Sequence, residues 1–145
     1  MKVVELERLI PHPVERVFEA WLDPDTFAEW FLPDPAVRLG QVTADARVGG
    51  SFLIEMIVDG QVLVHTGVYR RIEHNRSLVF TWKSAMTGDT ENVVEVWFDA
   101  REASTLLRLR HENLPNDESC ERHAAGWAGI VHHLEQYLTA RRSQS

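Results

Sequence analysis

The apolar residues of this 145-residue chain change their spacing near Pro115, and this change constrains the fold more than any other feature. Between residues 37 and 112 they recur at every second position, which is typical of half-buried strands. The pair Asp59-Gly60 favours a tight hairpin turn between two of these segments. After Pro115 the spacing becomes that of one long amphipathic helix, whose apolar stripe includes His123, Ala124 and Trp127. This pattern predicts an α+β fold in which a curved antiparallel sheet wraps around the C-terminal helix.

The first part of the chain predicts one strand and two short helices. Residues 2–10 alternate between apolar and charged side chains, as in a strand. Pro13 and Pro24 each suit the first turn of a helix, because an N–H at that position has no partner within the helix. Asp23 is a favourable N-cap for the second helix. The expected order is one strand, two helices, about six strands and one long helix.

Composition favours one globular domain over residues 1–145. Hydrophobic residues make up 44% of the chain and charged residues 26%, which suffices for a core at this length. The net charge of −7 provides no basic face for phosphates, so we expect no nucleic-acid partner. Cys120 is alone, which excludes an intrachain disulfide. The sequence has neither an apolar run of membrane-spanning length nor a signal-peptide pattern, and it predicts a cytoplasmic protein without membrane insertion.

Strand alternation predicts which side chains face the C-terminal helix. Residues two apart lie on one face of a strand, so each strand contributes one set to the concave side of the sheet. A curved sheet around a helix tends to leave a space, which makes this side a candidate cavity for a small apolar ligand. The alternative is a core filled by the same side chains. The strand candidates are Phe52, Ile54, Met56, Leu78, Phe80, Trp82, Val94, Val96, Phe98, Leu107, Leu109 and His111, and the helix candidates are Trp127, Ile130, Val131 and Leu134.

Tyr69 is a further candidate for this side, although the alternation changes within its strand. Tyr69 shares its face with His65 and Gly67, whereas Ile72 falls on the opposite face. We therefore expect a β-bulge in this segment, and a glycine inside a strand supports that expectation.

Two histidines are the polar candidates for the cavity. His111 points inward by its position in the last strand, and His123 lies one helical turn before Trp127. Together they can orient a carboxylate or phenol, or transfer a proton near neutral pH. Alternatively, His111 hydrogen-bonds a backbone group in the loop before the long helix.

The sequence predicts no metal and no other cofactor. Cys120 and His123 are spaced as two ligands on one helix turn, but a zinc site needs three or four converging ligands, and His132 and His133 point in different directions. Cys120 as a nucleophile lacks an orienting third group. The chain also lacks a P-loop, a dinucleotide-binding fingerprint and a nucleophile elbow.

Four segments in register resemble one known family. They read DPDTFAEWF (23–31), VGGSF (48–52), GVYRRIEHNRSLVFTW (67–82) and LRHENLPNDESCERHAAGW (109–127). By these segments the chain is identified as a member of the family of activator of heat-shock-protein-90 ATPase homologues, in the START-like helix-grip superfamily. The resemblance implies a sheet wrapped around the C-terminal helix with a cavity beneath it, but no particular reaction. It also implies that Trp30 and Phe31 lie at the cavity mouth, as a gate or as a hydrophobic plug.

The resemblance leaves three functions open. Our main expectation is a protein without enzymatic activity that binds a small hydrophobic molecule (aromatic, acyl or lipid-like), with His111, His123 or Tyr69 orienting its polar end. The first alternative is a cyclase- or aromatase-like enzyme that uses a cavity histidine. The second is a protein-interaction module like the co-chaperone, although this chain lacks that protein's additional N-terminal domain, so a chaperone partner is not supported. A homodimer is the default oligomer.

Overall fold

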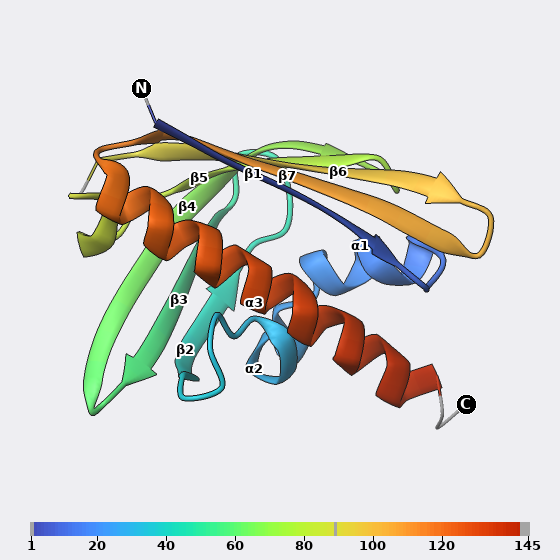
Figure 1. The fold of residues 1–145 in the computed structure, drawn as a ribbon, viewed down its shortest axis with the longest axis horizontal. Coiled ribbons are helices and arrows are strands. Elements are labelled where there is room, and N and C mark those ends of the chain that lie inside the picture. The colour runs from blue at the N-terminus through green and yellow to red at the C-terminus, as the bar shows by residue number, and fades with distance from the viewer. Residues whose placement is uncertain (1, 89, 143–145) are drawn as a thin grey trace.

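A computed structural model describes residues 2–88 and 90–142 and has the predicted α+β architecture (Figure 1). The predicted order of one strand, two short helical segments, a run of strands and one long helix is confirmed. The elements are β1 (Lys2–Ile10), α1 (Val14–Leu22), η1 (Pro24–Thr26), α2 (Phe27–Trp30), β2 (Arg38–Ala44), β3 (Ser51–Val58), β4 (Gln61–Glu73), β5 (Ser77–Trp82), η2 (Ala85–Thr87), β6 (Asn92–Arg101), β7 (Ser104–Leu114) and α3 (Asp117–Arg142).

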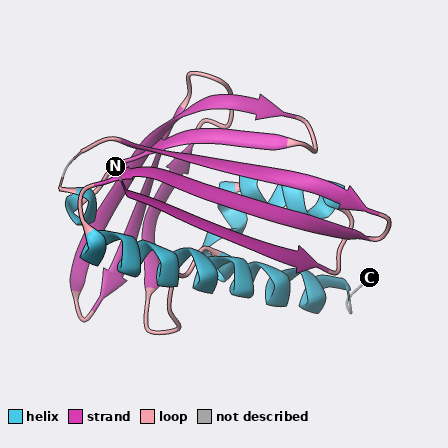
Figure 2. Cartoon of the chain, turned by 45° about the horizontal axis from the view of Figure 1, so that its top comes forward, coloured by secondary structure: helices cyan, strands magenta, loops and turns pink. Residues whose placement is uncertain are grey.

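The described strands form one antiparallel sheet in the order β1-β7-β6-β5-β4-β3-β2. Strands β2 to β7 follow one another as a meander, and β1 joins the sheet beside β7. The sheet is curved, and α3 runs across its concave side (Figures 1 and 2). Helices α1 and α2 lie beside α3, so the core is enclosed between the sheet and the helices.

The predicted turn and cap residues act as expected. Asp59 and Gly60 connect β3 to β4 with φ values of 51° and 77°, the positive values that a tight hairpin turn requires. The Asp23 side chain accepts a hydrogen bond from the backbone N–H of Asp25 at 3.2 Å. The helical segment that it caps is short: the 3-10 turn η1 leads into one turn of α-helix, α2.

The predicted β-bulge is present in β4. The pairing of β4 with β5 shifts register between Tyr69 and Arg71, and Tyr69 faces the core with 4% exposure. A Cβ atom at Gly67 would collide with the carbonyl oxygen of Thr81 and with the ring of Phe52. Only glycine therefore permits the close approach of β4 to its neighbours at this point.

Helix α3 begins where the sequence predicted. The Asn116 side chain accepts a hydrogen bond from the Ser119 backbone N–H at 2.8 Å, which is the usual contact of an N-cap. The predicted apolar stripe faces the sheet, except that Ala124 is exposed because it lies at the edge of the stripe. The buried residues of this helix are Ser119, His123, Trp127, Ile130, Val131, Leu134 and Leu138.

All residues predicted for the concave side are buried, with exposed fractions between 0% and 6%. Cross-strand pairs such as Val96 with Leu109 and Val94 with His111 place them on one face of the sheet. In the part of the chain that the structure describes, no helix combines the length and the apolar character needed to cross a membrane.

Candidate functional site

An aromatic cluster occupies the space between the sheet and α3. Trp82 of β5 and Trp127 of α3 are in contact, with ring centroids 5.1 Å apart. Trp21 of α1 and Phe31, which follows α2, approach Trp127 with centroid distances of 6.4 and 6.0 Å. Phe52 of β3 approaches Trp82 at 6.1 Å. Elements that are distant in the sequence thus build one aromatic cluster.

Two small voids adjoin this cluster, and Trp82 lines both of them. Their volumes are about 20 and about 60 Å³. A cavity of about 150 Å³ can hold benzene, so a ligand must displace side chains to enter either void. The smaller void is lined by Trp21, Phe27, Phe31, Phe52, Ile54, Tyr69, Leu78, Phe80 and Trp82. The larger void is lined by Pro33, Met56, His65, Trp82, Met86, Arg122, His123, Gly126, Trp127 and Ile130.

The predicted cavity residues divide into those that line a void and those that only fill the core. Trp30 belongs to the second group: it is 0% exposed, and its Nε1 donates a hydrogen bond to Thr26 Oγ1 at 3.0 Å. Phe31 lines the smaller void. Contact of any of these residues with a ligand remains a prediction. The predicted residues that line neither void are Trp30, Val94, Val96, Phe98, Leu107, Leu109, His111, Val131 and Leu134.

His111 is hydrogen-bonded through both ring nitrogens. Trp127 Nε1 donates to Nδ1 at 2.9 Å, and Nε2 lies 2.9 Å from Asn92 Oδ1. Because Nδ1 accepts, the neutral ring carries its proton on Nε2 and donates it to Asn92. The Asn92 amide then donates to the Asn113 carbonyl oxygen at 2.9 Å. The alternative prediction of a direct bond from His111 to the loop backbone is therefore wrong, because the side chain of Asn92 stands between them.

His123 lies against His111, with ring centroids 4.8 Å apart. Its Nδ1 donates to the backbone carbonyl of Ser119, one turn earlier in α3, at 2.8 Å. The Ser119 hydroxyl donates to the backbone carbonyl of Met86 at 2.9 Å. This last bond ties η2 to α3 and holds Met86 beside the larger void.

Three buried nitrogens of the lining residues make no hydrogen bond: Trp21 Nε1, His65 Nδ1 and Trp82 Nε1. His65 and Trp82 are neighbours, with ring centroids 4.9 Å apart, and each is 3% exposed. The backbone carbonyls of Ile54 and Leu63 lie near the His65 ring but give Nδ1 no bond of good geometry. Buried polar groups without partners are uncommon in proteins and call for a physical explanation.

Burial keeps the histidines of this region neutral. It lowers the pKa of His111 to about 3, and the neighbouring His123 adds to the effect. It lowers the pKa of His65 to about 4, although the Ile54 carbonyl opposes part of this shift. The pKa of His123 is also lowered by burial, against the effect of its bond to Ser119. With both nitrogens engaged and so low a pKa, His111 is poorly suited to proton transfer near neutral pH.

The spacing of Cys120 and His123 on α3 does not assemble a metal site. Among the residues that the structure describes, no three histidine, cysteine, aspartate or glutamate side chains come together in a group that could hold a metal ion. The Cys120 thiol is free and half-buried. His133 Nδ1 donates to the Leu32 carbonyl at 2.7 Å, and its ring centroid lies 5.6 Å from that of His132.

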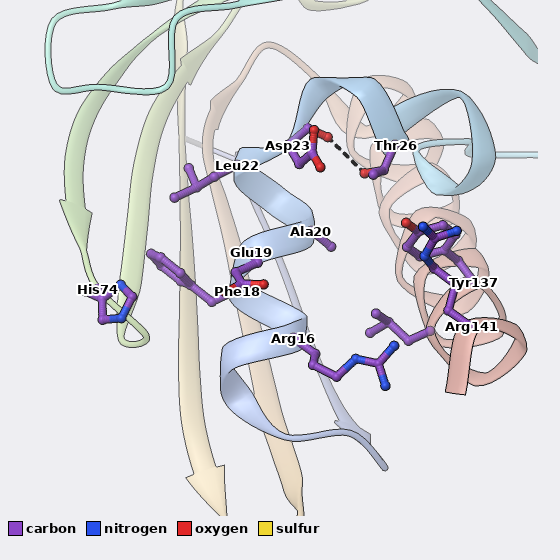
Figure 3. Close-up of a pocket in the computed structure, with 11 residues that line it drawn as sticks. Arg16, Phe18, Glu19, Ala20, Leu22, Asp23, Thr26, His74, Tyr137 and Arg141 are labelled. Atoms are coloured by element: carbon purple, nitrogen blue, oxygen red, sulfur yellow. Dashed lines mark hydrogen bonds between the residues drawn. The ribbon is translucent and has the colours of Figure 1, made fainter. Parts of the chain in front are cut away.

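A larger hollow, of about 510 Å³, lies on the surface between α1 and the C-terminal end of α3 (Figure 3). Arg16 reaches into it from α1, and Arg141 stacks over Tyr137 on α3 with 5.1 Å from guanidinium to ring centroid. Glu19 and Asp23 add negative charge to its wall, and both are exposed. This hollow is therefore a surface feature of mixed polarity, in contrast to the apolar voids of the core.

Seven of the residues that line the two voids were not among the predicted cavity residues: Trp21, Phe27, Pro33, His65, Met86, Arg122 and Gly126. Trp21 and Phe27 lie on the apolar faces of α1 and α2, and His65 shares its face with Tyr69, so the periodicity of the sequence contained a signal for all three. Met86 lies in η2, within the connection between β5 and β6, where no periodicity indicates which side chains turn inward.

Sequence comparison places this arrangement among known proteins. A family model described as Activator of Hsp90 ATPase homolog 1-like protein matches residues 11–139. No curated protein sequence matches the chain.

Solved structures with the same fold cover nearly the whole chain. Protein CV1439 from Chromobacterium violaceum is similar with a TM-score of 0.85 and 24% identity, over 94% of this chain and 97% of that one. The AHSA1-like protein from Aeromonas hydrophila has a TM-score of 0.80 and 23% identity, over 97% and 94%. DynU16, from the dynemicin biosynthetic locus, has a TM-score of 0.76 and 24% identity, over 96% of this chain and 48% of that one. At these identities the similarity shows the fold.

Proposed function

The chain belongs to the Activator of Hsp90 ATPase homolog 1-like family, within the START-like superfamily, and on this premise we propose that it binds a small hydrophobic molecule between the sheet and α3. Burial of apolar ligand surface against the aromatic cluster supplies most of the affinity. The origin of the structurally similar DynU16 in a biosynthetic locus supports a small molecule as ligand.

The observation that carries this proposal is the position of Trp82. Its ring lines both voids and its indole N–H has no partner. The indoles of Trp127 and Trp30, in contrast, are held by hydrogen bonds to His111 and Thr26. A rotation of Trp82 breaks packing contacts but no hydrogen bond, and it joins the two voids into one space.

The larger void provides the entry route in this proposal. Met86 and Arg122 line it, and Met86 is half-buried whereas Arg122 is exposed, so this end of the void lies near the surface. Methionine is flexible and can adopt several packing arrangements. Displacement of the Met86 side chain therefore opens a path between η2 and α3.

Binding without catalysis agrees with the electrostatics of the site. The neutral histidines supply hydrogen bonds, and the low pKa of His111 disfavours the cyclase-like alternative. The predicted residues that line the two voids then serve as the apolar walls, and His111 acts by positioning Trp127.

Native mass spectrometry of the freshly purified chain tests the proposal. A small molecule that is present in stoichiometric amount under gentle conditions and leaves on unfolding is the expected result. If the protein carries none, binding of benzene and phenol is measured by two-dimensional NMR. Met56→Phe, which fills the larger void, should abolish binding, whereas Leu9→Phe on the exposed outer face of β1 should not. Absence of any bound molecule together with no binding of either probe contradicts the proposal.

A further inference from the structure

Two polar atoms at the larger void are buried and have no hydrogen-bond partner. They are Trp82 Nε1 and His65 Nδ1. Both side chains line this void, each is 3% exposed, and their ring centroids are 4.9 Å apart. A ligand that supplies a partner recovers the free energy lost in burying such groups, and a pure hydrocarbon does not.

The chemistry of the two atoms limits what that partner can be. The indole N–H of Trp82 only donates, whereas His65 Nδ1 donates or accepts according to the tautomer of the ring. A hydroxyl oxygen accepts from Trp82 and donates its proton to His65. A carbonyl oxygen accepts from both. One oxygen atom on the ligand is therefore complementary to both nitrogens.

The surroundings of the void favour a ligand without charge. The one charged residue among its described lining residues is Arg122, whose side chain is 59% exposed and is paired with Glu118 at 2.7 Å. The neighbouring rings of His65 and His123 are neutral because burial lowers the pKa of each. A carboxylate between Trp82 and His65 would lose its hydration without gaining a buried cation.

We propose that the ligand is an uncharged aromatic or acyl molecule with a hydroxyl or carbonyl oxygen, and that Trp82 Nε1 and His65 Nδ1 bind this oxygen. The inference rests on the proposed function and adds the chemical class of the ligand. The apolar part of the molecule then lies against Trp127 and Ile130, which line the same void.

Three probes of one ring size test the inference: benzene, phenol and benzoate. Each is titrated into the full chain labelled with ¹⁵N, in which the five tryptophans give separate indole N–H signals. Phenol should bind roughly three- to tenfold more tightly than benzene, the effect of one net hydrogen bond. Benzoate should bind most weakly. Phenol, but not benzene, should shift the indole signal of Trp82 in the direction of a stronger hydrogen bond.

Matched variants test whether Trp82 Nε1 and His65 Nδ1 are the atoms that bind the ligand oxygen. Trp82→Phe removes the indole donor but leaves His65, so the ratio of the benzene and phenol dissociation constants should fall below that of the wild type. Trp97→Phe makes the same change on the outer face of the sheet, where Trp97 is 37% exposed, and should leave the ratio as in the wild type. His65→Phe should also reduce the ratio of the benzene and phenol dissociation constants. Each indole N–H signal should keep its assignment in this variant.

The possible failures are distinguishable. If benzene and phenol bind equally, if the preference for phenol is as large in Trp82→Phe as in the wild type, or if benzoate binds most tightly, the inference is overturned and the proposed function stands. If none of the probes binds and native mass spectrometry finds no bound molecule, the proposed function is contradicted. The wild-type indole signal keeps the test independent of whether Trp82→Phe folds, because phenol binding without a shift of that signal also overturns the inference.

Discussion

Trp127 Nε1 on α3 donates a hydrogen bond to His111 Nδ1 on β7 over 2.9 Å, and this bond joins the middle of the long helix to the inner face of the sheet. Through its other ring nitrogen, His111 is hydrogen-bonded to Asn92 of β6. Trp127 is thereby fixed, whereas the indole of the neighbouring Trp82 is not hydrogen-bonded. One wall of the candidate site is rigid and the other can rearrange.

Replacement of His111 should destabilise the protein even when the new side chain has a similar volume. His111→Phe keeps a ring of similar volume but leaves the buried Trp127 N–H and Asn92 oxygen without partners, so we expect a loss of about 2–4 kcal/mol in the free energy of unfolding. Urea denaturation measures this loss. His132→Phe, at an exposed position on α3, serves as control and should stay within about 0.5 kcal/mol. Equal midpoints for both variants would show that the network contributes nothing.

The buried histidines predict a loss of stability in mild acid. The pKa of His111 is lowered to about 3 and that of His65 to about 4, whereas unfolded histidine titrates near about 6.5. The unfolded chain therefore binds more protons below about pH 6.5, and the free energy of unfolding falls as the pH falls from there towards about 4. Each histidine contributes up to about 1.4 kcal/mol per pH unit.

Urea denaturation between about pH 7.5 and 5 checks this dependence. Stability should be constant above about pH 7 and decline below about pH 6.5, with a shallower decline in His111→Phe. An unchanged midpoint over this range would mean that the histidines are accessible to protons in the folded state.

Two glycines of α3 should respond in opposite directions to alanine. A Cβ atom at Gly129 would collide with the carbonyl oxygen of Pro33, whereas one at Gly126 would lie 3.4 Å from Pro33 Cβ, an ordinary contact. Gly129→Ala should lower the free energy of unfolding by roughly 1–3 kcal/mol, the usual cost of overpacking. Gly126→Ala should raise it by up to about 1 kcal/mol through helix propensity. Thermal unfolding of the two variants measures these changes. A rise in the free energy of unfolding of Gly129→Ala would contradict the close packing of the Pro33 loop on α3.

The entry route predicts different effects for two methionines of the larger void. Met86 is half-buried near the surface, whereas Met56 of β3 is 5% exposed. Met86→Ala should increase the association rate of phenol at least about twofold with a smaller change in affinity, because it widens the path. Met56→Ala enlarges the void and should strengthen binding, at a cost in stability of about 2–5 kcal/mol. NMR line-shape analysis yields both rates, and unchanged association in Met86→Ala would place the entry elsewhere.

Much of the architecture was predictable because its signals are local. The alternation in β3 and β5 to β7 identified the inward-facing side chains, the Asp59-Gly60 pair identified a hairpin, and Gly67 indicated the irregular part of β4. The resemblance of four segments to a known family agreed with these patterns and with the family model over residues 11–139. The exposed Ala124 shows the limit of this reasoning, because a helical stripe has edges that spacing alone does not define.

The details of the candidate site were less predictable. Periodicity identified His111 as inward-facing but not its partners, because Asn92 and Trp127 come from β6 and α3. It also could not separate Phe31, which lines a void, from Trp30, which fills the core, since the two are adjacent in sequence and both buried. No sequence pattern identified Met86 as a lining residue, because the apolar residues of the segment that contains it show no periodic spacing.

Hydrophobic periodicity alone identifies which faces of the strands and of the long helix turn inward, since it depends only on neighbours along the chain. Which of the buried indoles are hydrogen-bonded depends, in contrast, on how the elements pack together. Trp127 and Trp30 meet acceptors in His111 and Thr26, whereas Trp82 and Trp21 meet none. The volumes of the two voids around Trp82 are set in the same way. Both outcomes depend on the packing of several elements at once, and no single segment of the chain encodes them.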